Sequence, residues 1–143
     1  MRVLIIGLGS IAKKHINALI KINDQTVIYA LRSNRNAEDY LNVINIFDFE
    51  EAKKLQLDFA IISSPTNLHL ADIERCLTLN IPLFIEKPAF DSLEIGDILD
   101  KTNDTKSYIG CNLRFLDCLI FVKEFLGNVN NKINEVNVYF GSY

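Results

Sequence analysis

The chain has 143 residues, of which 49% are hydrophobic and 23% charged, a balance typical of one well-packed globular domain rather than of a disordered chain. Its 15 basic and 18 acidic residues give a net charge of -3, which predicts no general attraction to nucleic acid or to anionic lipid. No apolar run reaches the ~18 residues that a bilayer crossing needs, and Gly7 interrupts the N-terminal apolar stretch too early for a signal peptide. We therefore expect a cytoplasmic protein without nucleic-acid or membrane partners.

The cysteines and histidines predict neither disulfides nor a metal site. The three cysteines, Cys76, Cys111 and Cys118, are odd in number and form no CxxC pair. The two histidines, His15 and His69, lie far apart and lack the HxxxH or HExxH spacing of zinc sites. We expect reduced cysteines and no metal.

Short runs rich in valine, isoleucine and phenylalanine alternate with helical patterns along the first three quarters of the chain. The runs predict strands at residues 3–6, 26–31, 42–47, 58–63, 81–85 and 107–109. The helical patterns fall at residues 11–22, 37–41, 49–55, 67–79 and 92–101. This alternation predicts a doubly wound α/β fold, in which a parallel sheet carries helices on both faces.

The pattern changes after Gly110. A helix is expected at residues 115–126, and residues 133–140 alternate between apolar and polar side chains as a half-exposed strand does. Such a strand is typical of an antiparallel sheet, so we expect a second domain to begin at residue 116. Its exposed edge could pair with a second copy of the chain and form a homo-oligomer.

A glycine-rich turn follows the first predicted strand. Its sequence, Gly7-Leu8-Gly9-Ser10-Ile11-Ala12, has the GxGxxA spacing of dinucleotide-binding turns and leads directly into a helix. Gly7 permits the tight turn, Gly9 lets a pyrophosphate approach the backbone, and the helix start at Ser10 and Ile11 supplies free N–H groups. The alternative is a turn whose glycines serve the backbone alone.

The loop after the second strand predicts which cofactor is bound. It reads Arg32-Ser33-Asn34-Arg35, at the position where an NAD-binding unit carries an acidic residue for the ribose hydroxyls. A serine flanked by arginines suits a 2′-phosphate, because arginine makes charge-assisted contacts to phosphate oxygens. The loop therefore favours NADP, with NAD possible. The alternative is two solvated surface arginines.

Polar residues follow the fourth strand, at the edge where ligands bind in open parallel sheets. They read Ser64-Pro65-Thr66-Asn67-Leu68-His69. We expect the serine, proline, threonine and asparagine to line a cofactor crevice, while Thr66 or Asn67 could also cap the following helix. His69 is either a cofactor contact or an ordinary packed or surface histidine.

A Glu86-Lys87-Pro88 segment follows the fifth strand. Because proline keeps the preceding residue extended, Lys87 is expected to hold its ammonium in a fixed place beside the crevice. The ammonium could donate a proton or bind a substrate hydroxyl. The alternative is an ion pair with Glu86 that only closes the strand end.

These motifs, with His15 after the glycine turn and Gly110-Cys111-Asn112-Leu113-Arg114-Phe115 near the end, resemble in this order those of the Gfo/Idh/MocA oxidoreductases. The resemblance implies a Rossmann domain over residues 1–115. It also implies that residues 116–143 are the connecting helix and first strand of a substrate or oligomerisation domain. By the same resemblance Lys87 is the catalytic lysine, Glu86 lies in the cofactor site, and Asn112 and Arg114 lie near the nicotinamide. A cis bond between Lys87 and Pro88 is expected.

The resemblance implies an NAD(P)-dependent oxidoreductase that transfers hydride to or from a hydroxyl or keto group of a small carbohydrate-like substrate. That substrate would be a sugar, a sugar nucleotide or a cyclitol. Family members have two ordinary domains, and most of the second is missing here. The alternative is a non-catalytic dinucleotide-binding or assembly module, left by truncation, whose last strand pairs with a partner.

Overall fold

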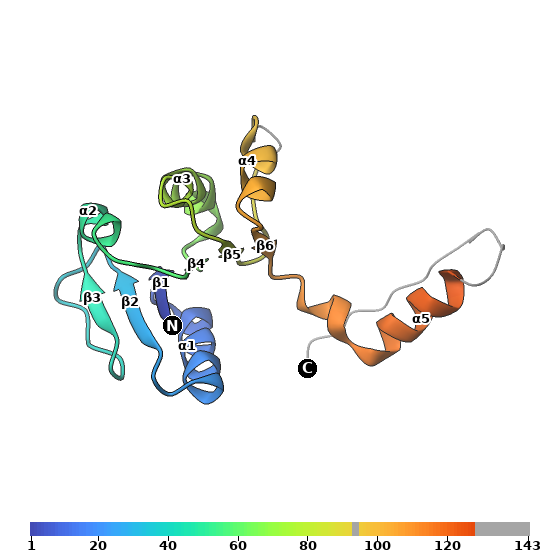
Figure 1. Cartoon of the computed structure of the whole chain (residues 1–143), viewed down its shortest axis with the longest axis horizontal. Helices are drawn as coiled ribbons and strands as arrows, with labels where there is room; N and C mark the ends of the chain where they lie inside the picture. The colour runs from blue at the N-terminus through green and yellow to red at the C-terminus, as the bar shows by residue number, and fades with distance from the viewer. Residues whose placement is uncertain (93–94, 128–143) are drawn as a thin grey trace. The chain divides into compact units, whose positions relative to one another are not determined.

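The computed structural model describes residues 1–92 and 95–127 (Figure 1). The chain divides into two compact units, Met1–Gly110 and Cys111–Tyr143. The division falls five residues before the domain boundary expected from the sequence.

A parallel sheet of six strands forms the centre of the first unit. All neighbouring strands pair in parallel, in the order β3-β2-β1-β4-β5-β6, which is the doubly wound order with a reversal between β1 and β4. The predicted sheet is thus confirmed. Its strands are β1 (Arg2–Ile6), β2 (Val27–Leu31), β3 (Ile44–Ile46), β4 (Phe59–Ile62), β5 (Leu83–Ile85) and β6 (Tyr108–Ile109).

Helices cover both faces of this sheet, as the sequence predicts. Figure 1 shows α1 (Ser10–Ile22) on one face and α2 (Phe49–Lys53), α3 (Thr66–Leu77) and α4 (Ile98–Asp104) on the other. Alternate residues of β1 face these two layers. Val3 packs in the cluster of Ile16 of α1, and Leu4 packs with Ile73 of α3. Because side chains alternate between the two faces along each strand, an apolar core forms on each face and holds the helices against the sheet.

One predicted helix does not form, and another begins later than expected. No helix forms at residues 37–41, where Leu41 has a φ of 48°. The Nη1 of Arg32 donates to the carbonyl oxygens of Ala37 and Glu38, which a helix would have used for its own hydrogen bonds. The helix expected at residues 92–101 begins only at Ile98, after Gly96 with a φ of 55°. Residues 93–94 of that expected helix lie outside the described residues.

The described part of the second unit contains the 3-10 turn η1 (Asn112–Phe115) and the helix α5 (Asp117–Gly127). The helix expected at residues 115–126 is therefore confirmed apart from its first turn. The strand expected at residues 133–140, and with it the antiparallel sheet and the oligomer edge, lies outside the described residues. No helix within residues 1–92 and 95–127 is long and apolar enough to cross a membrane.

Candidate dinucleotide-binding site

A cavity of about 560 Å³ opens at the carboxyl edge of the sheet, where the strand order reverses. Loops after β1, β2, β3 and β4 form its walls together with α3. In doubly wound sheets this is the crevice in which ligands bind. Five of the predicted cofactor residues line the cavity together: Gly7, Arg32, Ser33, Ser64 and Pro65.

Gly7 is required by the packing of the protein itself. Its φ is 81°, in the left-handed region, and a Cβ on it would lie 2.7 Å from the Cα of Ser64. The hydroxyl of Ser63 donates to the carbonyl oxygens of Ile6, at 3.1 Å, and Gly7, at 3.0 Å. The backbones of the turns after β1 and β4 are therefore in direct contact, and the Ser63 side chain joins them.

Gly9, in contrast, has free space around it. A Cβ on Gly9 would meet nothing within 4 Å, so the fold itself does not demand a glycine there. Gly9 caps α1 without any side-chain hydrogen bond, and the first turn of this helix carries no acidic residue. The N–H groups at the helix start, including those of Ser10 and Ile11, thus carry a partial positive charge next to open space. The turn fits a phosphate group.

The loop after β2 is partly used by the fold. Arg32 donates through Nη1 to the carbonyl oxygen of Glu38 at 2.7 Å and to Oδ1 of Asn45 at 3.3 Å, so this arginine also holds its own loop. The guanidinium of Arg35 lies 4.8 Å from the ring centre of Phe47, which lines the cavity. Ser33 is exposed. The loop Arg32–Arg35 contains no acid that could accept from ribose hydroxyls.

Two aspartates do line the cavity, but both are occupied. Asp48 caps α2 by accepting from the backbone N–H of Glu50 at 3.0 Å. Asp72 accepts from the hydroxyl of Ser64 and from the guanidinium of Arg75. Asp72 and Arg75 belong to no sequence motif, and their spacing of one helical turn was the only signal that could have paired them.

The residues after β4 behave differently from their predicted roles as caps. Residue Pro65 is the N-cap of α3, and this helix has no side-chain cap, so the capping expected of Thr66 or Asn67 does not occur. The hydroxyl of Ser64 points to Asp72 of α3. Neither Thr66 nor Asn67 makes a side-chain hydrogen bond to any residue in the described part of the chain, which leaves both side chains available to a ligand.

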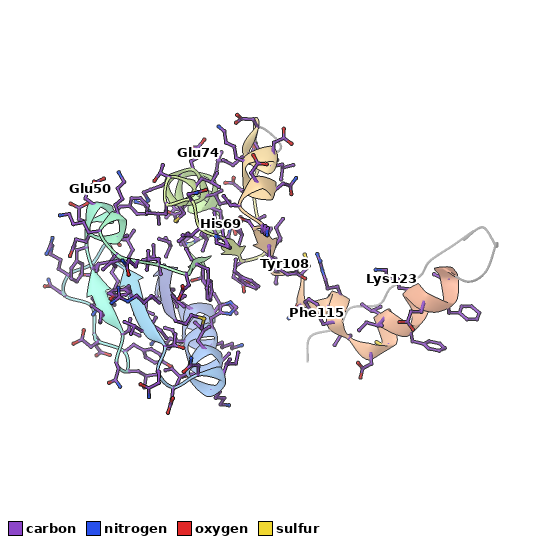
Figure 2. All side chains as sticks on the ribbon, viewed as in Figure 1. Glu50, His69, Glu74, Tyr108, Phe115 and Lys123 are labelled. Atoms are coloured by element: carbon purple, nitrogen blue, oxygen red, sulfur yellow. The ribbon has the colours of Figure 1, made fainter. Side chains whose placement is uncertain are left out.

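His69 is buried, with 1% of its surface exposed, and Figure 2 shows it between α3 and the sheet. Its Nε2–H donates to the carbonyl oxygen of Ser64 at 2.8 Å, and its Nδ1 lies 3.3 Å from the carbonyl oxygen of Ala89. The ring therefore links the loop after β4 to the loop after β5. The alternative of a packed histidine is confirmed, while direct contact with a cofactor stays a prediction.

Glu86 and Lys87 leave β5 at the same edge of the sheet. An oxygen of Glu86 lies 2.6 Å from Nε2 of His15 on α1, and its other oxygen accepts from the backbone N–H of Lys87 at 3.2 Å. Glu86 is thus paired with His15 rather than with the ammonium of Lys87. The Lys87-Pro88 bond is cis, as expected.

The ammonium of Lys87 is exposed and has no ion pair or hydrogen bond with any residue among 1–92 and 95–127. His15 follows the glycine turn, and no role for its side chain was predicted from the sequence. The T-shaped contact of its ring with Phe84, at 5.2 Å, brings it to the end of β5.

Asn112 and Arg114 belong to η1 of the second unit, so their predicted place near the nicotinamide stays a prediction. Within residues 1–92 and 95–127, no group of three or more histidine, cysteine or acidic side chains is arranged to hold a metal ion.

Comparison with known proteins agrees with this geometry. Residues 1–110 match the model of an oxidoreductase family with an NAD-binding Rossmann fold, GFO_IDH_MocA. The chain belongs to this family. Its six-stranded parallel sheet is the sheet of an NAD-binding Rossmann domain of this family. No curated protein matches the chain significantly.

Solved structures share the fold at low sequence identity. The WlbA dehydrogenase from Chromobacterium violaceum, in complex with NADH and UDP-GlcNAcA, is similar with a TM-score of 0.76 and 19% identity, over 89% of this chain and 39% of that one. The scyllo-inositol dehydrogenase from Lactobacillus casei gives 0.73 and 22%, over 89% and 41%. The WlbA dehydrogenase from Thermus thermophilus, with NAD and α-ketoglutarate, gives 0.72 and 23%, over 92% and 48%. The chain thus spans less than half of each.

Proposed function

We propose that the chain is the cofactor-binding part of an NADP-dependent oxidoreductase that transfers hydride to or from a hydroxyl or keto carbon of a sugar, sugar nucleotide or cyclitol. The observation that carries the proposal is the glycine turn at the point where the strand order reverses. There, Gly9 leaves open space beside the uncapped start of α1. Structural neighbours that bind UDP-GlcNAcA, or are named for scyllo-inositol, support this substrate class.

Different residues of the chain bind different parts of the cofactor. The backbone from Gly7 to Ile11 binds the pyrophosphate through its N–H groups and the helix dipole. Ser33 and Arg35 bind the 2′-phosphate, with Arg32 supplying charge and holding the loop. Ser64, Pro65, Thr66 and Asn67 form the facing wall of the crevice, with His69 beneath them. When bound, the nicotinamide gives or takes the hydride.

Lys87 handles the proton at the substrate oxygen. Its backbone N–H is held by Glu86, and Glu86 is held by His15, so both residues leave β5 in a fixed direction while the ammonium stays unpaired within the described residues. A positioned ammonium stabilises negative charge on a substrate oxygen or donates a proton to it. Asn112 and Arg114, in η1, are proposed as further cofactor residues.

Titration calorimetry tests the cofactor. The 143-residue chain is titrated with NADPH and NADH, alone and as Ser33→Asp. We expect NADPH to bind the unchanged chain at least about tenfold more tightly, and Ser33→Asp to reverse the preference, because a carboxylate repels the phosphate and accepts from ribose hydroxyls. Arg35→Ala should weaken NADPH alone.

The control variant is Lys101→Ala, which removes an exposed ion pair with Asp97 on the distant α4. Arg32→Ala is avoided because Arg32 holds its loop together. Weak and equal binding of both cofactors by the unchanged chain and by Ser33→Asp would remove the assignment to NADP.

Turnover separates the enzyme from a binding module. NADPH oxidation is followed with keto sugars, keto inositols and keto sugar nucleotides, using the chain as given and any longer gene product. We expect Lys87→Met to lower turnover at least about 100-fold while NADPH affinity is unchanged, since general acid catalysis contributes that much. Tight NADPH binding without turnover of any substrate in either form would favour the non-catalytic module instead.

A further inference from the structure

A buried acid and an arginine on α3 form one wall of the cofactor cavity. Asp72 has 6% of its surface exposed and accepts from both Ser64 and Arg75. The guanidinium of Arg75 lies 5.0 Å from the ring centre of Phe49, the first residue of α2. Ser64, Phe49, Asp72 and Arg75 all line the cavity. The pair therefore lies inside the candidate site, and none of the roles derived above uses it.

Arg75 has two neighbours that hold it, although 41% of its side chain is exposed. Its Nη2 donates to Asp72, and its guanidinium carbon lies 5.0 Å from the ring centre of Phe49. The second oxygen of Asp72 is bound by Ser64, so the carboxylate is held in turn. What Arg75 can offer the cavity is the exposed part of its planar guanidinium and its remaining N–H groups. A guanidinium held in this way is a planar surface in a wall of the crevice.

The charge balance decides what this surface would bind. The carboxylate of Asp72 compensates the charge of Arg75, which weakens its attraction for a phosphate. The arginines after β2 have no acidic partner in an ion pair within residues 1–92 and 95–127, so they are the better phosphate ligands. A planar guanidinium still stacks on an aromatic ring. Arg75 therefore suits a base rather than a phosphate.

The position of the pair agrees with a base. Once the pyrophosphate is assigned to the turn at Gly7 and the ribose to the loop at Ser33, the adenine is the part of the cofactor left for the rest of this cavity. The remaining walls are largely apolar and include Leu31, Pro65 and Leu68. We propose that Arg75, held by Asp72 and Phe49, is a specificity-determining residue that stacks on the purine ring of the cofactor. This inference rests on the proposed function.

The test compares ligands with and without the purine. The 143-residue chain and its Arg75→Leu and Arg75→Lys variants are titrated with NADPH, with 5′-AMP and with reduced nicotinamide mononucleotide, which has no purine. Both variants should bind NADPH and 5′-AMP about tenfold more weakly, the scale of stacking on one base, with the mononucleotide unchanged. Lysine keeps the charge and loses the plane, so it should not rescue binding.

The matched control is Arg35→Leu, which should weaken NADPH and leave 5′-AMP unchanged, because 5′-AMP lacks the 2′-phosphate. Unfolding midpoints accompany every titration, and Arg75→Gln replaces Arg75→Leu if the leucine variant does not fold. Full affinity for 5′-AMP in Arg75→Leu, rescue by lysine, or an equal loss for the mononucleotide each overturns the role of Arg75 alone. An unchanged chain that binds neither NADPH nor 5′-AMP overturns the proposed function as well.

Discussion

The two halves of the sheet's carboxyl edge differ in how their loops are held. After β4 and β5, the side chains of Ser63, Ser64, His69 and Glu86 all make hydrogen bonds within the described chain. After β1 and β2, Gly9 has open space around it, and the side chains of Arg32 and Asn34 make hydrogen bonds within their own loop. The loops after β4 and β5 are held to other elements by buried side chains, although Thr66, Asn67 and the ammonium of Lys87 stay unpaired among the described residues. The turn after β1 leaves backbone donors next to open space.

This difference indicates a division of labour within one crevice. Groups that must keep a fixed direction, such as the backbone of Lys87, are attached to a network of side chains and carbonyl oxygens. The groups proposed to bind a phosphate keep free hydrogen-bond donors, which a bound ligand would satisfy. Gly7 lies where the loops after β1 and β4 touch, so a substitution there should perturb the fold most severely.

The largest effect is expected from Gly7→Ala. The added methyl would lie 2.7 Å from the Cα of Ser64, and alanine disfavours a φ of 81°. We expect a loss of about 3 kcal/mol or more in the free energy of unfolding, measured by urea denaturation. A loss below about 1 kcal/mol would show that the two turns are not locked together.

The next effect is expected from His69→Ala, which removes the donor to the carbonyl oxygen of Ser64 and the ring beside the carbonyl oxygen of Ala89, and opens a hole under α3. The free energy of unfolding should fall by about 2–3 kcal/mol in the same urea experiment. Leu99→Ala, at an exposed position on α4, is the control and should change it by less than about 0.5 kcal/mol. An equal change in both variants would argue against loops after β4 and β5 that are held in place by His69.

A smaller change in stability, with a large change in binding, is expected from Gly9→Ala. No atom lies within 4 Å of the new methyl, so the free energy of unfolding should change by about 1 kcal/mol or less. NADPH affinity should fall at least about tenfold, because the methyl separates the phosphates from the backbone N–H groups. Calorimetry on the variant measures the NADPH affinity, and an unchanged affinity would contradict phosphate binding at the open turn after β1.

The smallest effect concerns the reactivity of Cys76, a buried residue of α3. Burial raises the pKa of its thiol to about 12, so at pH 8 the thiol stays almost entirely protonated. We expect a disulfide reagent at pH 8 to label the exposed Cys111 and Cys118 promptly and Cys76 only on unfolding. His69→Ala should speed the labelling of Cys76, and prompt labelling in the unchanged chain would show that the region around α3 opens freely.

Much of the fold follows from local pattern, because each strand of a covered parallel sheet is a short apolar run of its own. The glycine turn, the loop Arg32–Arg35 and the segment Glu86–Pro88 come to one edge because parallel strands place their carboxyl ends together. The expected helix at residues 37–41 failed where a tertiary contact from Arg32 competed with local propensity. The pattern of apolar and polar residues along the chain does not reveal such a contact.

The parallel sheet, its helical layers and the family of the chain could all be predicted from the residue patterns alone. Only the tertiary structure decided that Glu86 pairs with His15, 71 residues away, and that His69 bridges two loops. It also turned Asp72 and Arg75 into a wall of the cavity. These pairings depend on which side chains meet after the strands have packed, whereas strand and turn formation depend on neighbours along the chain.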